Sequence, residues 1–227
     1  MTDVRKALEA ERQMEREFVA EALESETQPK GWPAALLMFH VSMWRERLRN
    51  VLLEFQADRP YAPPQGNIDG LNDEELASGI GTPLADVAGR SDKLLAELIT
   101  LSDELGDRPF KWPVGTTTFE ALLRNSYAHP RVHIFEYWKE NGNLDKAHRL
   151  FEEGVSDMRE ISAPPIVMAT ALYNLACTRA AQDRVDEALE LLVEAFPMRP
   201  DLKVGAPSDP DLEALHDNPG FKALVSG

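Results

Sequence analysis

Apolar residues recur at intervals of three and four along much of the first 140 residues, which is the spacing of one face of an α-helix. The clearest case is residues 82–105, where Thr82 and Pro83 provide a helix cap and a first turn. Its stripe consists of Leu84, Val87, Ser91, Leu94, Leu98, Leu101 and Leu105. A second stripe, between Pro33 and about Gln56, consists of Leu37, His40, Trp44, Leu48, Val51 and Phe55. Both segments are predicted to be helices that pack in a bundle.

Two more helices are predicted on either side of these segments. Residues 3 to about 25 form a more charged one, with inner residues Val4, Leu8, Met14 and Phe18. Residues 116–140 form another, capped by the threonines at 116–118, with inner residues Phe119, Leu122, Ser126, His129, His133 and Tyr137. Residues 57–66 are expected to be a loop, 67–81 irregular or short-helical, and 106–115 a linker, and we recognise no alternating strand pattern. The sequence thus predicts an all-α fold in which residues 1–145 form a four-helix bundle.

The rest of the chain follows a different pattern. Pro164 and Pro165 interrupt it, and the residues that follow match one tetratricopeptide unit of about 34 residues. The matching positions are Leu172, Leu175, Ala176, Ala188, Leu192, Ala195 and Pro200. A partial copy lies between Trp138 and Phe151. Because such a helical hairpin cannot bury its apolar face alone, residues 146–227 are predicted to form tetratricopeptide-like helices packed on the bundle.

Composition narrows the classes of partner. The chain has 227 residues, 43% of them hydrophobic, and a formal net charge of −15. This charge disfavours nucleic acid and anionic membranes as partners, and no apolar run approaches the roughly 20 residues that cross a bilayer. The charged start is unlike a signal peptide, and the single cysteine, Cys177, allows no internal disulfide. We therefore expect a cytoplasmic protein without a nucleic-acid or membrane partner, in which Cys177 is a small buried hydrophobe.

Three of the five histidines stand in a pattern suited to one metal ion. His129 and His133 are four positions apart, so they share a helix face with Cβ atoms roughly 6 Å apart, and His40 interrupts the apolar stripe of another helix. Three imidazoles would bind Zn²⁺, Ni²⁺ or Fe²⁺ and leave an open position for water or a low-molecular-weight thiol. The alternative is that each is a hydrogen-bonded core histidine. Pro130 requires a kink or a local bulge in the helix if the pair is to converge.

Residues one helical turn from these histidines are candidates for the pocket wall or for contacts that orient the ligands. They are Trp44, Arg47, Asn125 and Tyr137. For each, the alternative is ordinary packing or surface exposure. Glu46 and Glu136 are possible bases, but charged residues on solvated helix faces are common, so no catalytic residue is assigned. His148 and His216 lie in the C-terminal part, where we expect them to be solvated.

Four short segments together resemble the DinB/YfiT-like superfamily, and most closely its ClbS/DfsB branch. They are Gly31–Trp44 (GWPAALLMFHVSMW), Ile68–Asn72 (IDGLN), Lys111–Val114 (KWPV) and Asn125–His133 (NSYAHPRVH). The resemblance extends over roughly residues 5–145, and it rests on the order and spacing of the segments. It implies a four-helix bundle in an up-down-down-up arrangement, a protein that is often dimeric, and a three-histidine metal site that maps onto His40, His129 and His133.

The resemblance also implies activities. Members include thiol-dependent transferases and isomerases, and the ClbS branch is linked to hydrolytic protection against a reactive DNA-damaging metabolite. The sequence therefore favours a metal-dependent hydrolase or thiol transferase that acts on a small electrophilic molecule, with loop 57–81 helping to close the pocket. The competing interpretation is a non-catalytic adaptor whose tetratricopeptide-like segment binds a protein partner. Metal binding distinguishes the two, because an adaptor would not depend on the histidines.

Overall fold

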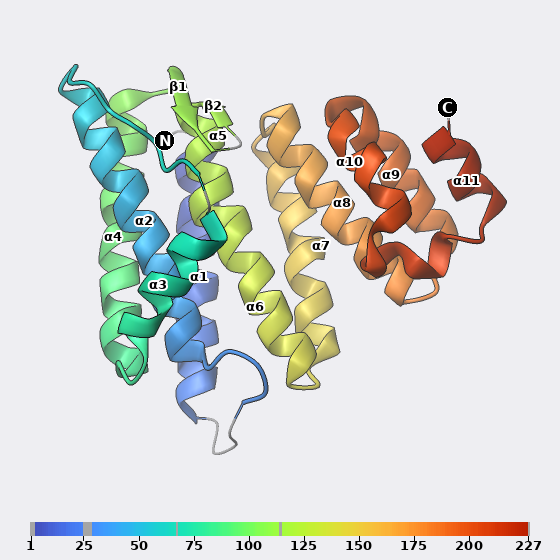
Figure 1. The fold of residues 1–227 in the computed structure, drawn as a ribbon, viewed down its shortest axis with the longest axis horizontal. Helices are drawn as coiled ribbons and strands as arrows, with labels where there is room; N and C mark the ends of the chain where they lie inside the picture. The colour runs from blue at the N-terminus through green and yellow to red at the C-terminus, as the bar shows by residue number, and fades with distance from the viewer. Residues whose placement is uncertain (1–2, 25–28, 67, 114, 227) are drawn as a thin grey trace. The chain divides into compact units, whose positions relative to one another are not determined.

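The computed structural model of the protein describes residues 3–24, 29–66, 68–113 and 115–226. Helices make up most of this described part, and its strands form one two-stranded sheet (Figure 1). The all-α class predicted from the periodicity is therefore correct. The contacts divide the chain into two compact units, residues 1–147 and residues 148–227.

Four long helical segments of the first unit lie side by side in Figure 1. They are α1 (Asp3–Glu24), α2 (Ala34–Gln56), α4 (Leu84–Leu105) and a composite segment of α5 (Thr118–Leu123), the π-helical turn η1 (Arg124–Ala128) and α6 (His129–Glu140). α2 packs closely along α4, and α1 packs against both α4 and η1. The bounds are close to those expected from the apolar stripes, except that the expected end of the first helix, at residue 25, lies outside the described residues.

The apolar stripes of these helices form the core of the first unit. Its largest fully buried apolar side chains are Leu8, Leu37, Met38, Leu48, Leu52, Leu95, Leu98, Leu122, Leu123 and Ile134. Local signals set the helix starts. Pro33 and Pro83 each precede a first turn, and the Thr117 side chain accepts a hydrogen bond from the Glu120 N–H at 3.2 Å, which satisfies one free donor at the start of α5.

Two short elements differ from the prediction. Residues 68–79, expected to be irregular or short-helical, form the helix α3 (Ile68–Gly79). The expected linker 106–115 contains strand β1 (Pro109–Trp112), which pairs antiparallel with β2 (Gly115–Thr117). Phe110 and Trp112 are buried on one face of β1 while their neighbours are exposed. An alternation this short cannot be recognised as a strand in the sequence, and Val114, which belongs to the same segment, lies outside the described residues.

The inner face of α1 is only partly as predicted. Val4, Leu8 and Phe18 are buried, but Met14 is only half-buried. Glu11 and Glu15 take inner positions instead, with 0% and 4% of their surface exposed. Carboxylates are almost never buried to this extent without a partner, so apolar periodicity gives no reason to place either glutamate inside.

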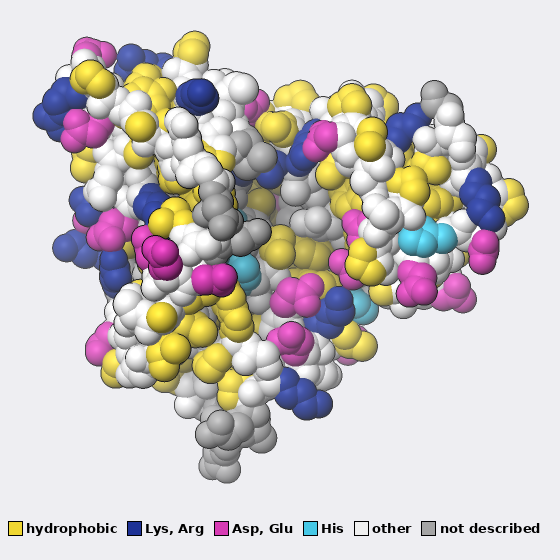
Figure 2. All heavy atoms as spheres, in the orientation of Figure 1, with side chains coloured by type: hydrophobic (Ala, Val, Ile, Leu, Met, Phe, Trp, Pro, Cys, Tyr) yellow, Lys and Arg dark blue, Asp and Glu magenta, His cyan; other side chains and the backbone are white. Residues whose placement is uncertain are grey.

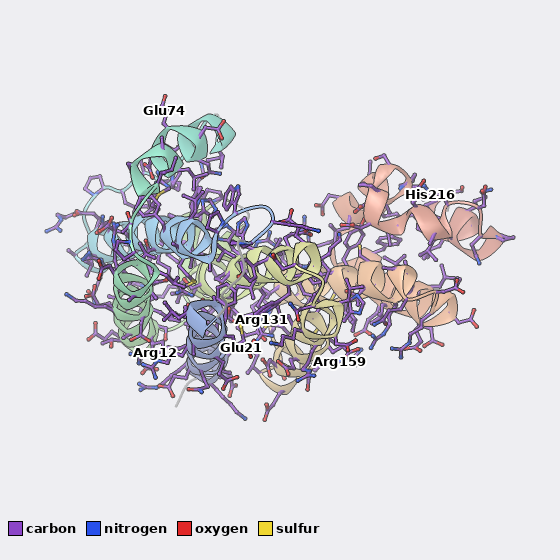
Figure 3. The ribbon with its side chains drawn as sticks, turned by 90° about the horizontal axis from the view of Figure 1, so that it is seen from below. Arg12, Glu21, Glu74, Arg131, Arg159 and His216 are labelled. Carbon is purple, nitrogen blue, oxygen red and sulfur yellow. The ribbon has the colours of Figure 1, made fainter. Side chains whose placement is uncertain are left out.

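Each of these carboxylates pairs with a buried arginine. Arg131 points from α6 toward α1 (Figure 3), and its Nε donates to Glu11 Oε2 at 2.6 Å. Arg45 of α2 donates to both oxygens of Glu15, at 2.7 and 2.5 Å, and to Ser91 Oγ at 2.8 Å. Two arginines and two glutamates therefore form a charge network, Glu11–Glu15–Arg45–Arg131, inside the core.

The second unit consists of shorter helices. α7 (Leu144–Glu160) crosses the boundary between the units and is followed by α8 (Pro165–Ala181), α9 (Val185–Met198), α10 (Pro200–Gly205), the 3₁₀ turns η2 (Ala206–Ser208) and η3 (Pro210–Leu215), and α11 (Pro219–Ser226). α8 and α9 pack closely together. The apolar residues matched to the tetratricopeptide pattern, at 172, 175, 176, 188, 192 and 195, are all buried. Cys177, expected to be buried, is half-buried against this core.

Among the described residues, no helix is both long and apolar enough to span a bilayer. On the face shown in Figure 2, the described lysine and arginine side chains are interspersed with aspartate and glutamate and do not gather in a basic patch.

Candidate metal centre

The three histidines selected from the sequence converge in the first unit. His40 lies on α2, while His129 begins α6 and His133 follows one turn later. The Nε2 atom of His129 lies 3.0 Å from Nε2 of His40 and 2.9 Å from Nε2 of His133. The ligand atoms of all three lie within 4.8 Å of one another. The three imidazoles thus direct nitrogen atoms into one small volume.

Pro130 explains the local shape of the helix that carries two of these histidines. Proline has no N–H, so residue 130 cannot bond back to the carbonyl of Ser126 in α-helical register or of Asn125 in π-helical register. The chain forms the π-helical turn η1 directly before His129. A π-turn inserts one residue and rotates everything that follows. The local bulge that the sequence required is therefore present.

Both of these carbonyls accept hydrogen bonds from side chains. The Asn125 carbonyl accepts one from the His129 ring, and the donor is Nδ1, because Nε2 faces the other two histidines. This bond leaves His129 Nε2 bare, as a metal ligand requires. The Ser126 carbonyl accepts a hydrogen bond from Arg45 Nη2 at 3.1 Å. The second bond ties the π-turn to the buried charge network.

The surroundings keep all three imidazoles neutral. Burial lowers the pKa of His40 to about 3 and the pKa of His133 to about 4. The pKa of His129 lies well below its ordinary value of 6.5, first because of burial and then because of charge on His133, His40 and Arg45. A metal-binding imidazole has to be deprotonated. The triad is therefore in the protonation state that binds a cation at neutral pH.

The donor set fits a divalent transition-metal ion. Zinc held tetrahedrally at about 2.0–2.1 Å keeps its nitrogens about 3.3 Å apart, a few tenths of an ångström more than the separations of 2.9 and 3.0 Å in the triad. Without a cation, the bare Nε2 of His129 accepts well only one of the N–H groups that its two neighbours can offer. His40 Nδ1 is buried without a hydrogen-bond partner among the described residues, so the packing of Trp32 and Trp44 against its ring sets its orientation.

Two cavities reach the triad, and they share no lining residue. The first, the His129 cavity, has a volume of about 270 Å³. It is lined by Trp44, Ile68, Asn72, Trp112, Pro113, Arg124, Asn125 and His129. The Trp44 indole N–H donates to Asn72 Oδ1 at 3.0 Å, and the Trp44 carbonyl accepts from Asn125 Nδ2 at 3.2 Å. An aromatic wall with a few fixed polar groups is typical of a small-molecule site.

The second cavity, the His133 cavity, lies on another side of the triad and has a volume of about 200 Å³. It is lined by Gly31, Trp32, Leu37, His133, Glu136, Tyr137 and Glu140. The Trp32 indole stacks on the His133 ring with 5.6 Å between centroids and 10° between planes. The triad thus lies between two tryptophans, because Trp44 meets the rings of His40 and His129 edge to face.

The four residues expected near the histidines differ in their positions. Trp44 and Asn125 line the His129 cavity, and Tyr137 lines the His133 cavity. Arg47 lines neither of them. Its guanidinium lies 4.9 Å from the centre of the Trp44 ring and pairs with Glu75. Arg47 therefore supports the cavity wall from behind and does not form the wall itself.

The sequence did not single out Trp32, Asn72 and Trp112, which also line the cavities. Each belongs to a segment that carries the family resemblance, and both tryptophans directly precede a proline, so an aromatic residue in a rigid turn was the available signal. Of the described residues in the expected closing loop 57–81, only Ile68 and Asn72 line either of these two cavities, both from α3. Position 67 of that loop lies outside the described residues.

The remaining two histidines stand apart from the triad. They are half-buried, although we expected them to be solvated. His148 Nδ1 lies 2.8 Å from Gln182 Nε2, and the His216 ring stacks on Phe221 at 5.8 Å. Both contacts are ordinary packing and hydrogen bonding within the second unit.

Comparisons with protein-family models, curated proteins and solved structures found no match to this chain.

Proposed function

We propose that the protein is a metal-dependent enzyme that acts on a small electrophilic molecule, by hydrolysis or by transfer of a thiol. The observation that carries the proposal is the convergence of three neutral imidazoles from two helices between two small cavities. A charge-free triad of nitrogen ligands suits Zn²⁺, Ni²⁺ or Fe²⁺ better than Mg²⁺ or Ca²⁺, which prefer oxygen ligands.

We further propose that the first unit is a DinB-like four-helix bundle with up-down-down-up topology. In support, residues from all four resembling segments, Trp32, Asn72, Trp112 and Asn125 among them, line the two cavities beside the triad. On the same basis the second unit is a tetratricopeptide-like segment. Its support is the burial of the apolar positions of the pattern along α8 and α9.

His40, His129 and His133 would hold the ion, and the ion would supply Lewis acidity and lower the pKa of a water or thiol. The chain supplies the rest of the site. The Asn125 carbonyl fixes the tautomer of His129. Trp32 and Trp44 limit the movement of the rings and exclude water from them. Two separate cavities leave room for two reactants, which favours thiol transfer over hydrolysis.

The partners implied by this proposal are small molecules. A homodimer is expected from the family resemblance, and the second unit is the part of the chain that would bind a protein partner. If the second unit proves to bind a peptide tightly while the histidines are dispensable, the adaptor interpretation replaces the enzymatic one.

Metal content tests the proposal. Protein purified without an affinity tag should contain close to one equivalent of Zn, Ni or Fe by elemental analysis, and His129→Ala should abolish tight binding because it removes the central ligand. His216→Ala is the matched control, since His216 is not one of the three clustered histidines and should leave metal content unchanged. Equal metal content in the wild type and in the triple alanine variant would exclude the site.

Turnover then separates the reaction types. Metal-loaded protein should be screened against activated esters, epoxides and halo-aromatic compounds, with and without low-molecular-weight thiols. Activity that needs a thiol and is lost in His133→Ala supports transfer, and thiol-independent loss of the ester supports hydrolysis. If no compound gives turnover that depends on His133, the enzymatic proposal fails even when metal is bound.

A further inference from the structure

The His133 cavity differs in charge from the His129 cavity. Glu136 and Glu140 both line it, and its described lining residues include no lysine or arginine, whereas Arg124 lines the His129 cavity. Lys139 lies 3.8 Å from Glu136 on the exposed side of α6 and offsets part of that one charge. Two carboxylates therefore line the His133 cavity beside a candidate metal ligand.

An aromatic ring stands next to these carboxylates. Trp32 lines the same cavity and stacks on His133. A cation beside an indole gains a cation–π attraction in addition to its ion pairs. An ammonium group is a small organic cation, so it can contact the indole and the carboxylates at the same time. Carboxylates alone would be an ordinary solvated surface. Together with the tryptophan and the cavity, they form a binding environment for an organic cation.

The loop at Gly31 lies against one of these carboxylates. A Cβ atom at Gly31 would lie 1.7 Å from Glu140 Oε2, so the carboxylate in this position leaves no room for a side chain at residue 31. Gly31 has a φ of 67°, in the region that favours glycine. The Lys30 N–H donates to Asn141 Oδ1 at 2.9 Å, which ties the same loop to the end of α6. The loop and the end of α6 thus bring Gly31 and Glu140 together in one cavity wall.

We propose that the His133 cavity is a subsite for an organic ammonium group, carried by a molecule whose other end reaches the metal. This inference rests on the metal-dependent function proposed above and deepens it. The preferred co-substrate is an aminothiol, with its thiol at the triad and its ammonium group between Glu136 and Glu140. The His129 cavity, which has aromatic walls and an arginine, is left for the electrophile.

Cobalt provides the test, because a thiolate bound to Co²⁺ gives a charge-transfer absorption band. Protein loaded with Co²⁺ is titrated with cysteamine, which has an ammonium group, and with 2-mercaptoethanol, which has none. The two thiols differ in acidity, so the quantity to compare is the ratio of their dissociation constants in each variant. Thiol acidity cancels when this ratio in the wild type is divided by the ratio in a variant.

The double variant Glu136→Gln/Glu140→Gln should shift this ratio by about tenfold against cysteamine, because each partly exposed ion pair contributes up to about fivefold in affinity. Glu74→Gln is the control for a glutamate-to-glutamine change, since it removes one negative charge from a residue that points outward from α3 (Figure 3) and lines neither cavity. Its ratio should equal that of the wild type. Cobalt stoichiometry should be the same in all three proteins.

Two outcomes would overturn the inference, and they differ. If both thiols give the band and the ratio is the same in the wild type and the double variant, the ammonium subsite is wrong while the metal site stands. If no thiol gives the band, or cobalt does not bind, the proposed function fails and the inference fails with it.

Discussion

Arg45 is the residue whose replacement should perturb the first unit most. Its guanidinium is fully buried and makes four hydrogen bonds, two to Glu15, one to Ser91 Oγ and one to the Ser126 carbonyl. Arg45→Met keeps a long apolar stem and removes all four. The Glu15 carboxylate, 4% exposed, is then left in the core without its partner.

The expected cost follows from that uncompensated charge. Breaking a buried ion pair from one side destabilises a protein by about 3–5 kcal/mol, whereas replacing both partners with apolar residues is often close to neutral. Glu15→Met should therefore cost a similar amount. The double variant should lose only about 1–3 kcal/mol, because Ser91 and the Ser126 carbonyl still lose a donor. The singles would sum to about 6–10 kcal/mol, so the coupling between the two positions should be several kcal/mol.

Tryptophan fluorescence during urea unfolding isolates the relevant unit. All four tryptophans, at positions 32, 44, 112 and 138, belong to residues 1–147. Fluorescence therefore reports the first unit even if the second unfolds in a separate transition, which far-UV circular dichroism would reveal. Arg45→Lys serves as an intermediate variant, because it retains the charge and loses the bidentate geometry.

Two results would contradict a strongly coupled buried pair. One is additive effects of Arg45→Met and Glu15→Met, and the other is a loss below about 1 kcal/mol in either single variant. Either result would mean that water reaches the carboxylate or that the pair contributes little in the folded state.

Three further predictions concern the helix α6, α1 and the triad. Pro130→Ala restores a backbone N–H that competes for the carbonyls before His129, so Co²⁺ should bind roughly 10-fold more weakly or worse, and unchanged affinity would show that the π-turn does not position the ring. Burial raises the pKa of Glu11 to about 8, above the ordinary 4.5, so the stability of the first unit should fall as pH rises from 4.5 through about 8. Urea midpoints measured across that pH range should show this fall in the wild type and a smaller fall in Glu11→Gln. The lowered pKa values of His40 and His133 mean that metal should remain bound as the pH falls to about 4, which dialysis followed by elemental analysis measures. Loss of metal near pH 6.5 would show that the histidines have ordinary pKa values.

The helices and the triad could be predicted because their signals are local or repeated. A stripe such as that of α4 uses many positions, so one misplaced residue does not change the outcome. His129 and His133 are four positions apart on one helix, and His40 stands in a stripe that has to face the core, so their convergence needed only the two helices to pack. Pro130 was recognised as the point where the helix had to depart from α geometry.

The charge network and the cavities could not be predicted, because they depend on pairings between distant elements. Arg45 and Arg47 both lie just beyond Trp44, and the sequence of α2 alone does not tell which one is buried. The choice is made by Glu15, which comes from α1 and meets Arg45 in the core. Trp32 and Trp112 likewise line the two cavities from segments outside the long helices, where periodicity gives no information.

The charge network and the triad are linked through Arg45. The positive charge of Arg45 lowers the pKa of His129, so a metal cation at the triad would be repelled by the same charge. Glu15 holds that guanidinium with two hydrogen bonds and places a negative charge beside it. This carboxylate, which breaks the apolar stripe of α1, therefore offsets from inside the core the positive charge of Arg45 behind His129. In this way α1 would support a divalent ion at the triad although it provides no ligand.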